Sequence, residues 1–151
     1  MENEFITHAR YMKMALQEGR KALPKCLPNP PVGCIIVREG KIIAQAYTQA
    51  PGHPHAEAAA MAQVEGSLED CEVYVTLEPC SFQGRTPSCA RTLVSRNAKK
   101  VIIAMIDPDP RNLGRGIQIM EEAGIEVILG VEQEAVSAFL GPYLNLSENH
   151  I

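Results

Sequence analysis

The pattern of apolar and polar residues in the first third of the chain predicts a helix followed by a β-hairpin. Apolar residues recur near the 3.6-residue helical period over residues 4–19, which predicts an amphipathic helix that packs on a sheet. Residues 32–37 and 41–47 are strand-like, and the Arg38-Glu39-Gly40 segment between them is typical of a tight hairpin connection. Residues 23–31 contain four prolines, which exclude regular helix or central strand and predict a stiff loop.

The rest of the chain alternates between helix-like and strand-like segments. Helices are predicted at residues 55–64, 87–96, 116–123 and 132–140, and strands at residues 72–77, 100–105 and 126–129. Because helices separate these strands, we expect them to be parallel neighbours, unlike the hairpin strands. The prediction is an α/β fold of three layers, in which helices flank a five-stranded mixed sheet.

Length and composition fit a single domain over residues 1–151, with a core from about residue 3 to 140 and a loose tail at residues 145–151. The sequence is 46% hydrophobic and 21% charged, and no apolar run approaches the ~20 residues of a membrane span. The acidic start lacks a signal-peptide pattern, so we expect a cytoplasmic protein. A net charge of −4 and a pI near 5.6 give no electrostatic footprint for nucleic acid.

The five cysteines indicate metal binding better than disulfide formation. Their number is odd and no secretion signal accompanies them. Cys34 lies in an apolar run and is predicted to be a small buried hydrophobe. Cys26 and Cys71 have no motif around them and receive no role. Cys80 and Cys89 are the two that fit a metal site.

A zinc site is predicted from His55, Cys80 and Cys89. A catalytic zinc ion takes three protein ligands of the imidazole and thiolate type and keeps a fourth position for water. Glu57 follows His55 by two positions in the first turn of a predicted helix, so it is either a helix-capping acid or the group that carries the proton of that water. Together these residues match the zinc-deaminase signature H-x-E…P-C-x-x-C, which favours the proton carrier. Residues 81–88 separate the two cysteines, where the short signature has two residues.

The cysteine segment resembles the pyrimidine deaminase of bacterial riboflavin biosynthesis. In that family a TLEPCS…G(K/R)TPPC segment carries both cysteines, and here residues 76–81 read TLEPCS and residues 84–87 read GRTP before Cys89. The likeness covers residues 12–131 and includes Pro28-Asn29-Pro30, Val32-Gly33, Asp107-Pro108, Pro110 and Gly114-Arg115-Gly116.

The resemblance implies a cytidine-deaminase-like fold, a Zn²⁺ cofactor and hydrolytic deamination of 2,5-diamino-6-ribosylamino-4(3H)-pyrimidinone 5′-phosphate, an aminopyrimidine. It also makes a homo-oligomer plausible. Bacterial members are often fused to a reductase domain that follows the deaminase. We expect no such domain within residues 1–151, so a separate reductase would be the partner in the pathway.

The resemblance also assigns substrate-binding residues. Asn29 either forms a turn or meets the pyrimidine edge, since its amide both donates and accepts hydrogen bonds, and the resemblance favours contact. Arg85 stands where the family has a basic residue that meets the phosphate, although a surface arginine often has no special task. Asp107 is also predicted to contact the substrate. Glu78 is predicted to support the site from behind the metal ligands, in preference to acid–base work.

Three further predicted contacts differ from the family pattern. Thr48 and Phe82 replace histidines, and Asp109 replaces an asparagine. These differences leave open a deaminase that acts on another aminopyrimidine, a purine or a nucleoside. A tRNA-editing deaminase fits less well, because the chain is acidic and the spacing of Cys80 and Cys89 is long. A non-catalytic zinc module is the remaining alternative, and Glu57 argues against it.

Overall fold

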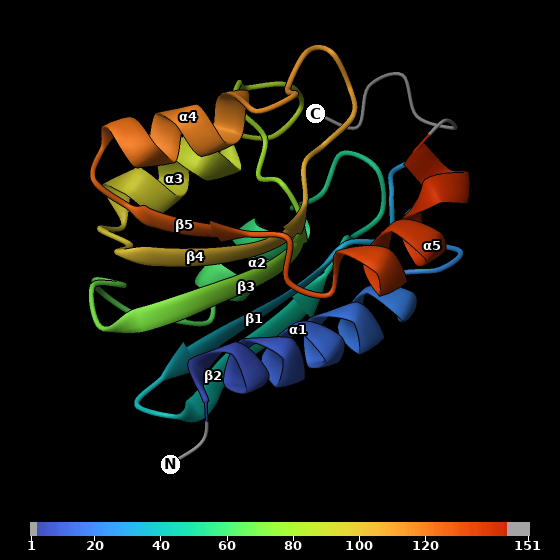
Figure 1. Ribbon diagram of the computed structural model, residues 1–151. Coiled ribbons are helices and arrows are strands. Elements are labelled where there is room, and N and C mark those ends of the chain that lie inside the picture. Colours follow the sequence, from blue (N-terminus) through green and yellow to red (C-terminus); the bar gives the residue numbers. More distant parts are fainter. Residues whose placement is uncertain (1–2, 145–151) are drawn as a thin grey trace.

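The computed structural model describes residues 3–144, so the predicted loose tail at residues 145–151 lies outside the described residues. Its helices and strands alternate as the sequence predicts (Figure 1). The elements are α1 (Glu4–Arg20), β1 (Gly33–Arg38), β2 (Lys41–Tyr47), α2 (Ala56–Met61), β3 (Cys71–Leu77), α3 (Cys89–Ser95), β4 (Lys100–Met105), α4 (Arg115–Glu122), β5 (Glu126–Leu129) and α5 (Gln133–Leu144).

The strands form one mixed sheet in the order β2-β1-β3-β4-β5. β1 pairs antiparallel with β2 and with β3, whereas β3, β4 and β5 are parallel to one another. The predicted hairpin and the predicted parallel neighbours are both confirmed. The sheet therefore changes from antiparallel to parallel at β3, the strand that leads to Glu78 and Cys80.

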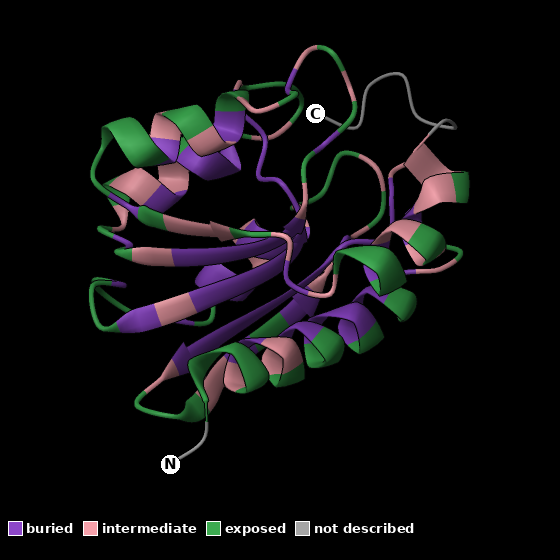
Figure 2. Cartoon of the chain, in the orientation of Figure 1, coloured by how far each residue is buried: buried purple, intermediate pink, exposed green. Residues whose placement is uncertain are grey.

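Helices cover both faces of the sheet and complete three layers. Figure 1 shows α1 and α5 on one face, and α2 and α3 on the other, with α4 beside α3. Every residue of β1 from Gly33 to Val37 is buried, as are nearly all residues of β3 and the middle of β4. Continuous burial along a strand requires cover on both faces. Figure 2 shows the same arrangement, with buried central strands and exposed outer surfaces on the helices.

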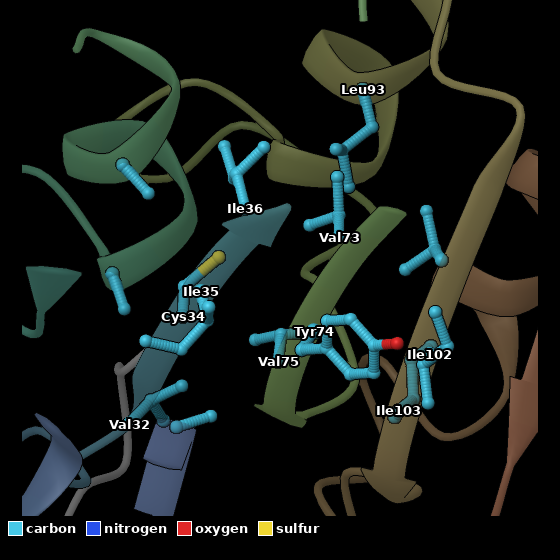
Figure 3. Close-up of a cluster of buried hydrophobic side chains, with 14 of the residues drawn as sticks. Val32, Cys34, Ile35, Ile36, Val73, Tyr74, Val75, Leu93, Ile102 and Ile103 are labelled. Atoms are coloured by element: carbon cyan, nitrogen blue, oxygen red, sulfur yellow. The ribbon is translucent and has the colours of Figure 1, made fainter. Parts of the chain in front are cut away.

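The core joins the central strands to the helices around them. Ile36, Val73 and Ile102 come from three neighbouring strands and are fully buried in one hydrophobic cluster. Figure 3 shows Leu93 of α3 reaching toward Val73 of β3. Packing of this kind fixes the helix that carries Cys89 against the strand that leads to Cys80.

Two helix ends lie at least three residues from the predicted ones, and the others lie within two residues, as at the start of α3, which is Cys89 and not residue 87. α2 ends at Met61 and not at residue 64, and the guanidinium of Arg96 donates hydrogen bonds to the carbonyl groups of Met61, Val64 and Gly66. A side chain from the C-terminal end of α3 thus supplies donors for the carbonyl groups at the end of α2. The sequence of α2 itself does not predict this. α5 continues to Leu144 with Pro142 near its end, beyond the predicted residue 140.

The backbone of α1 is in contact with the backbone at the start of β1. A Cβ atom at Gly33 would lie 1.8 Å from the carbonyl oxygen of Ala15, so only glycine fits there. This contact holds the proline-rich loop between α1 and β1 against the end of the sheet. Among residues 3–144, no helix has the length and apolar character needed to cross a membrane.

Candidate active site

A pocket opens at the carboxyl end of β3 and brings together residues from distant parts of the chain. It encloses about 380 Å³, including its open mouth. The pocket is lined by Asn29, Pro30, Val32, Thr48, His55, Glu57, Leu77, Glu78, Cys80 and Asp107. The carboxyl ends of parallel strands are a common place for ligand binding in α/β proteins. Most of the predicted site residues therefore meet in one place.

His55 is the residue that caps the start of α2, and not a member of its first turn. Its backbone is extended, with φ −66° and ψ 166°, and Ala56 begins the helix. The prediction that His55 lies in the first turn is therefore wrong, whereas Glu57 does lie there. The proline-containing loop before His55 delivers this residue in an extended conformation, so the imidazole turns toward the cysteines.

The two cysteines are held together by the start of α3. Cys89 is the first residue of that helix, and its backbone N–H donates a hydrogen bond to Cys80 Sγ over 3.2 Å. Ser88 caps the helix by accepting a hydrogen bond from Arg91 N, and its hydroxyl donates to Cys80 O over 2.8 Å. Ser88 thereby joins the helix start directly to the segment that carries Cys80.

The geometry of the three predicted ligands fits a zinc ion. Bonds of about 2.05 Å to nitrogen and 2.3 Å to sulfur, at tetrahedral angles, place the two atoms about 3.6 Å apart. His55 Nδ1 lies 3.8 Å from Cys80 Sγ and 3.7 Å from Cys89 Sγ. The three ligand atoms all lie within 4.8 Å of one another, and this is the one such cluster among residues 3–144. The donor set and the spacing both suit zinc.

The surroundings of the two sulfurs shift their pKa values in opposite directions. Cys80 has a pKa lowered to about 5, because the Cys89 thiol and then His55 stabilise its thiolate by hydrogen bonds, against the effect of burial. The pKa of Cys89 is correspondingly raised, because its thiol is hydrogen-bonded to Cys80 and its sulfur is buried. Burial lowers the pKa of His55, but the hydrogen bond with Cys80 and the charge of Glu57 outweigh it and raise this pKa. The lowered pKa of Cys80 favours its thiolate, the form of cysteine that binds metals.

Glu57 has the environment of a proton carrier. Its side chain is buried and lines the same pocket as His55 and Cys80. Burial raises the pKa of Glu57 to about 7, and the nearby charge of His55 only partly counteracts this. A carboxyl group with a pKa near neutrality can both accept and return a proton.

Glu78 is a structural brace, in line with the supporting role predicted for it. Its carboxylate accepts hydrogen bonds from the backbone N–H groups of Asp107 (3.1 Å), Gly114 (3.0 Å) and Ile117 (3.1 Å). Burial raises the pKa of Glu78, and these three donors pull it down in part. Glu78 therefore connects the end of β3 to the loop that carries Asp107 and to the start of α4.

Removing this carboxylate will destabilise the protein. In Glu78→Ala, one buried and two part-buried N–H groups lose their acceptor, so we expect the free energy of unfolding to fall by about 2–4 kcal/mol. Glu78→Gln keeps one acceptor oxygen and should lose less. Urea unfolding of the metal-free variants, with the exposed Glu121→Ala as control, measures the difference. Equal unfolding midpoints for Glu78→Ala and Glu121→Ala would show that the brace is not needed.

Asn112 and Gly116 support the same region and were not predicted. The buried Asn112 side chain donates hydrogen bonds to Pro79 O (3.2 Å) and Asp107 Oδ2 (3.3 Å). A Cβ atom at Gly116 would lie 2.0 Å from Pro79 O. Both residues contact Pro79 from more than 30 positions away in the sequence, so no local pattern indicates the role of Asn112. Gly116 belongs to the Gly-Arg-Gly motif of the resemblance, but the sequence offers no structural reason for a glycine there.

Three of the predicted substrate-binding residues line the pocket, namely Asn29, Thr48 and Asp107. The Thr48 hydroxyl is already engaged: it accepts a hydrogen bond from Val32 N over 2.9 Å and donates to Pro30 O over 3.0 Å. Thr48 thereby fixes the end of the loop that carries Asn29. Contact of these three residues with a substrate stays a prediction.

The other three predicted contacts do not line the pocket. Arg85 is exposed on the loop between Cys80 and Cys89. Phe82 packs against the two cysteines, and Asp109 forms an ion pair with Arg111. Because Arg111 neutralises Asp109, this carboxylate is a weaker obstacle to a phosphate than the sequence suggested. The role of all three in substrate binding likewise stays a prediction.

The remaining cysteines behave as the sequence indicated. All five cysteines are free, which agrees with the prediction against disulfides. Cys34 is fully buried in the core, and burial raises the pKa of its thiol, so its prediction as a small hydrophobe is confirmed. Pro30, Val32 and Leu77, which the sequence analysis named only as parts of the family motifs and gave no role, supply an apolar wall to the pocket.

The fold and the His-Cys-Cys site, with a buried glutamate beside it, define a domain of the zinc-deaminase class. The family of the cytidine and deoxycytidylate deaminase zinc-binding region matches residues 6–105, and the chain belongs to this family.

Within the family, the chain is similar to riboflavin biosynthesis proteins. It is 43% identical to the riboflavin biosynthesis protein RibD of Chlamydia muridarum over 138 residues, which cover 91% of the chain and 37% of that protein. The structure of Acinetobacter baumannii RibD matches with a TM-score of 0.91 at 37% identity, covering 95% of the chain and 40% of that structure.

A third match is the diaminohydroxyphosphoribosylaminopyrimidine deaminase/5-amino-6-(5-phosphoribosylamino)uracil reductase of Thermotoga maritima. Its TM-score is 0.89 at 34% identity, covering 95% of the chain and 42% of that structure. The chain thus spans less than half of the length of these relatives.

Proposed function

We propose that the protein is a zinc-dependent hydrolytic deaminase whose substrate is 2,5-diamino-6-ribosylamino-4(3H)-pyrimidinone 5′-phosphate. The observation that carries this proposal is the convergence of His55 Nδ1 on the sulfurs of Cys80 and Cys89, at 3.8 and 3.7 Å, in the pocket that Glu57 also lines. The similarity to the Thermotoga maritima protein supports the choice of substrate, because that protein is named for the same deamination.

The chemistry divides between the metal site and Glu57. His55, Cys80 and Cys89 would hold the zinc ion, which when bound supplies the Lewis acidity that makes water a stronger nucleophile at neutral pH. Glu57 accepts a proton from the attacking water and returns it to the departing amino group. In the net reaction a ring C–NH₂ bond is broken, water provides the oxygen of the new carbonyl group, and ammonia leaves.

The pocket offers suitable contacts for a flat, polar ring. Val32 and Leu77 contribute apolar surface, while Asn29 and Asp107 place an amide and a carboxylate on the lining. Such a combination of apolar wall and few polar groups is typical of small-molecule sites. In this proposal Asn29 and Asp107 hold the ring edge, and Arg85 meets the phosphate from the loop between the cysteines.

The wider setting follows from the same proposal. The uracil product would pass to a reductase, the second activity in the name of the Thermotoga maritima protein. Buried thiols that stay free suit a reducing compartment, so we place the protein in the cytoplasm. We also propose a homo-oligomer, on the family resemblance.

Release of ammonia from the proposed substrate tests the function. Zinc-loaded protein should deaminate the diaminopyrimidine phosphate with a kcat/KM of about 10⁴ M⁻¹s⁻¹ or more. Cytidine, deoxycytidylate and guanine should give at least about a hundredfold less, because cytidine and guanine lack the phosphate, and deoxycytidylate carries its amino group and its sugar at other ring positions.

The same assay decides between this function and the second candidate. Two observations favour a different aminopyrimidine, purine or nucleoside: the engaged hydroxyl of Thr48 and the Phe82 side chain, which packs on the cysteines. If the protein deaminated one of these amines and not the diaminopyrimidine phosphate, that amine would replace the diaminopyrimidine phosphate as the proposed substrate.

A further inference from the structure

The two ring nitrogens of His55 face different partners. Nδ1 points to the sulfurs of Cys80 and Cys89, as the zinc geometry requires. On the other edge of the ring, Nε2 lies 3.3 Å from the hydroxyl oxygen of Thr86, its hydrogen-bonding partner among residues 3–144. The sequence assigned no role to Thr86, which lies between the two cysteines.

The metal site dictates the direction of this hydrogen bond. A neutral imidazole carries a hydrogen on one nitrogen and a lone pair on the other. A nitrogen that binds zinc must present its lone pair, so Nδ1 as the ligand leaves the hydrogen on Nε2. The Thr86 hydroxyl can accept that hydrogen, because a hydroxyl group has two acceptor lone pairs besides its single donor.

We propose that Thr86 is a positioning residue for the metal site: its hydroxyl accepts the Nε2–H hydrogen bond of His55 and so holds the Nδ1 lone pair toward the metal position. The inference rests on the zinc site of the proposed function. Outer-shell partners of this kind orient metal-binding histidines and raise their basicity.

The loop between the cysteines is built to present Thr86. The N–H of Gly84 donates a hydrogen bond to Thr86 O over 3.1 Å, which closes the loop on itself. Pro87 follows and restricts the backbone of the residue before it. Ser88 then ties the loop to Cys80 O and to the start of α3. The long spacing between Cys80 and Cys89 thus brings a hydroxyl over the far edge of the His55 ring, which two intervening residues could not do.

Zinc affinity measures the role of Thr86 without any substrate. Competition with a chromogenic chelator should show that Thr86→Val, which keeps the branched shape but lacks the hydroxyl, binds zinc about 10–100-fold more weakly than the unchanged protein. Thr86→Ser keeps the hydroxyl and should stay within about threefold. Thr7→Val removes a hydroxyl that donates a solvent-exposed hydrogen bond to Asn3 O on α1, outside the site, and serves as the matched control.

A second measurement separates positioning from a merely structural role. In the zinc-loaded protein, the Nε2–H proton of His55 should give an NMR signal protected from exchange in the unchanged protein and in Thr86→Ser, and this protection should be lost in Thr86→Val. The melting temperature of the metal-free protein should change by no more than about 2 °C in Thr86→Val, since the hydrogen bond matters for the bound metal and not for the fold.

The outcomes are distinguishable. Equal zinc affinity of Thr86→Val and the unchanged protein would overturn the role of Thr86 and leave the proposed function standing. A loss of stability in metal-free Thr86→Val with unchanged exchange of the Nε2–H proton would also overturn it, in favour of a structural role. Failure of the unchanged protein to bind zinc would remove the proposed function itself.

Discussion

In Glu57→Gln, we expect kcat for deamination to fall by about 10²–10⁴-fold while zinc remains bound. The amide of glutamine has nearly the shape of the carboxylate but cannot accept a proton from water or return one to the amine. Because the amide is neutral and fills the same buried space, the ligands His55 and Cys89 should keep their places. The loss should therefore appear in kcat at full zinc content, and much less in KM.

Ammonia release at saturating substrate, together with the zinc content of the same preparation, checks this expectation. Glu65→Gln makes the same chemical change at an exposed position shortly after α2 and should leave kcat unchanged. Turnover of Glu57→Gln close to that of Glu65→Gln, with zinc bound to both, would mean that another group carries the proton.

Cys89→Ser should abolish metal binding at working concentrations, and activity with it. Only His55 and Cys80 would remain as strong ligands, since a serine hydroxyl binds zinc far more weakly than a thiolate. We expect about one zinc ion per chain in the unchanged protein and less than about 0.1 in the variant after dialysis against a mild chelator.

Cys71→Ser is the matched control for this variant. Cys71 is also buried, but its sulfur lies 3.6 Å from Asp70 Oδ1, an interaction that a serine hydroxyl can keep. Metal content and ammonia release of the control should equal those of the unchanged protein. If Cys89→Ser retained one zinc ion and full activity, the three-ligand site would be the wrong description of this pocket.

In the proposed function, the phosphate of the substrate is bound by Arg85, on the solvent-exposed loop between Cys80 and Cys89. Arg85 is exposed, whereas Arg111 is engaged by Asp109. An exposed guanidinium on a loop can reach an anion at the mouth of the pocket without breaking an existing ion pair. Contact of Arg85 with the phosphate therefore stays a prediction, and the exposure of its side chain is compatible with it.

The sequence by itself determined the elements of the fold and the chemical groups of the candidate metal site. Helical and strand periods are local properties, so the positions of α1, the β1–β2 hairpin and β4 followed directly from the order of apolar residues. The possible ligands and the proton carrier could also be recognised from the sequence, because the chemistry of an imidazole, thiolate or carboxylate belongs to the side chain itself. These residues are His55, Cys80, Cys89 and Glu57.

Only the tertiary structure decided what each side chain near the metal site does. Thr48 and Glu78 have polar groups that the sequence left available, yet the fold engages them with backbone groups of Val32 and Ile117. Thr86 gained a partner, His55, from 31 positions away. Hydrogen-bond partners of this kind depend on the strand order and on the packing of loops at one end of the sheet, and these arise from contacts between distant segments that no local pattern encodes.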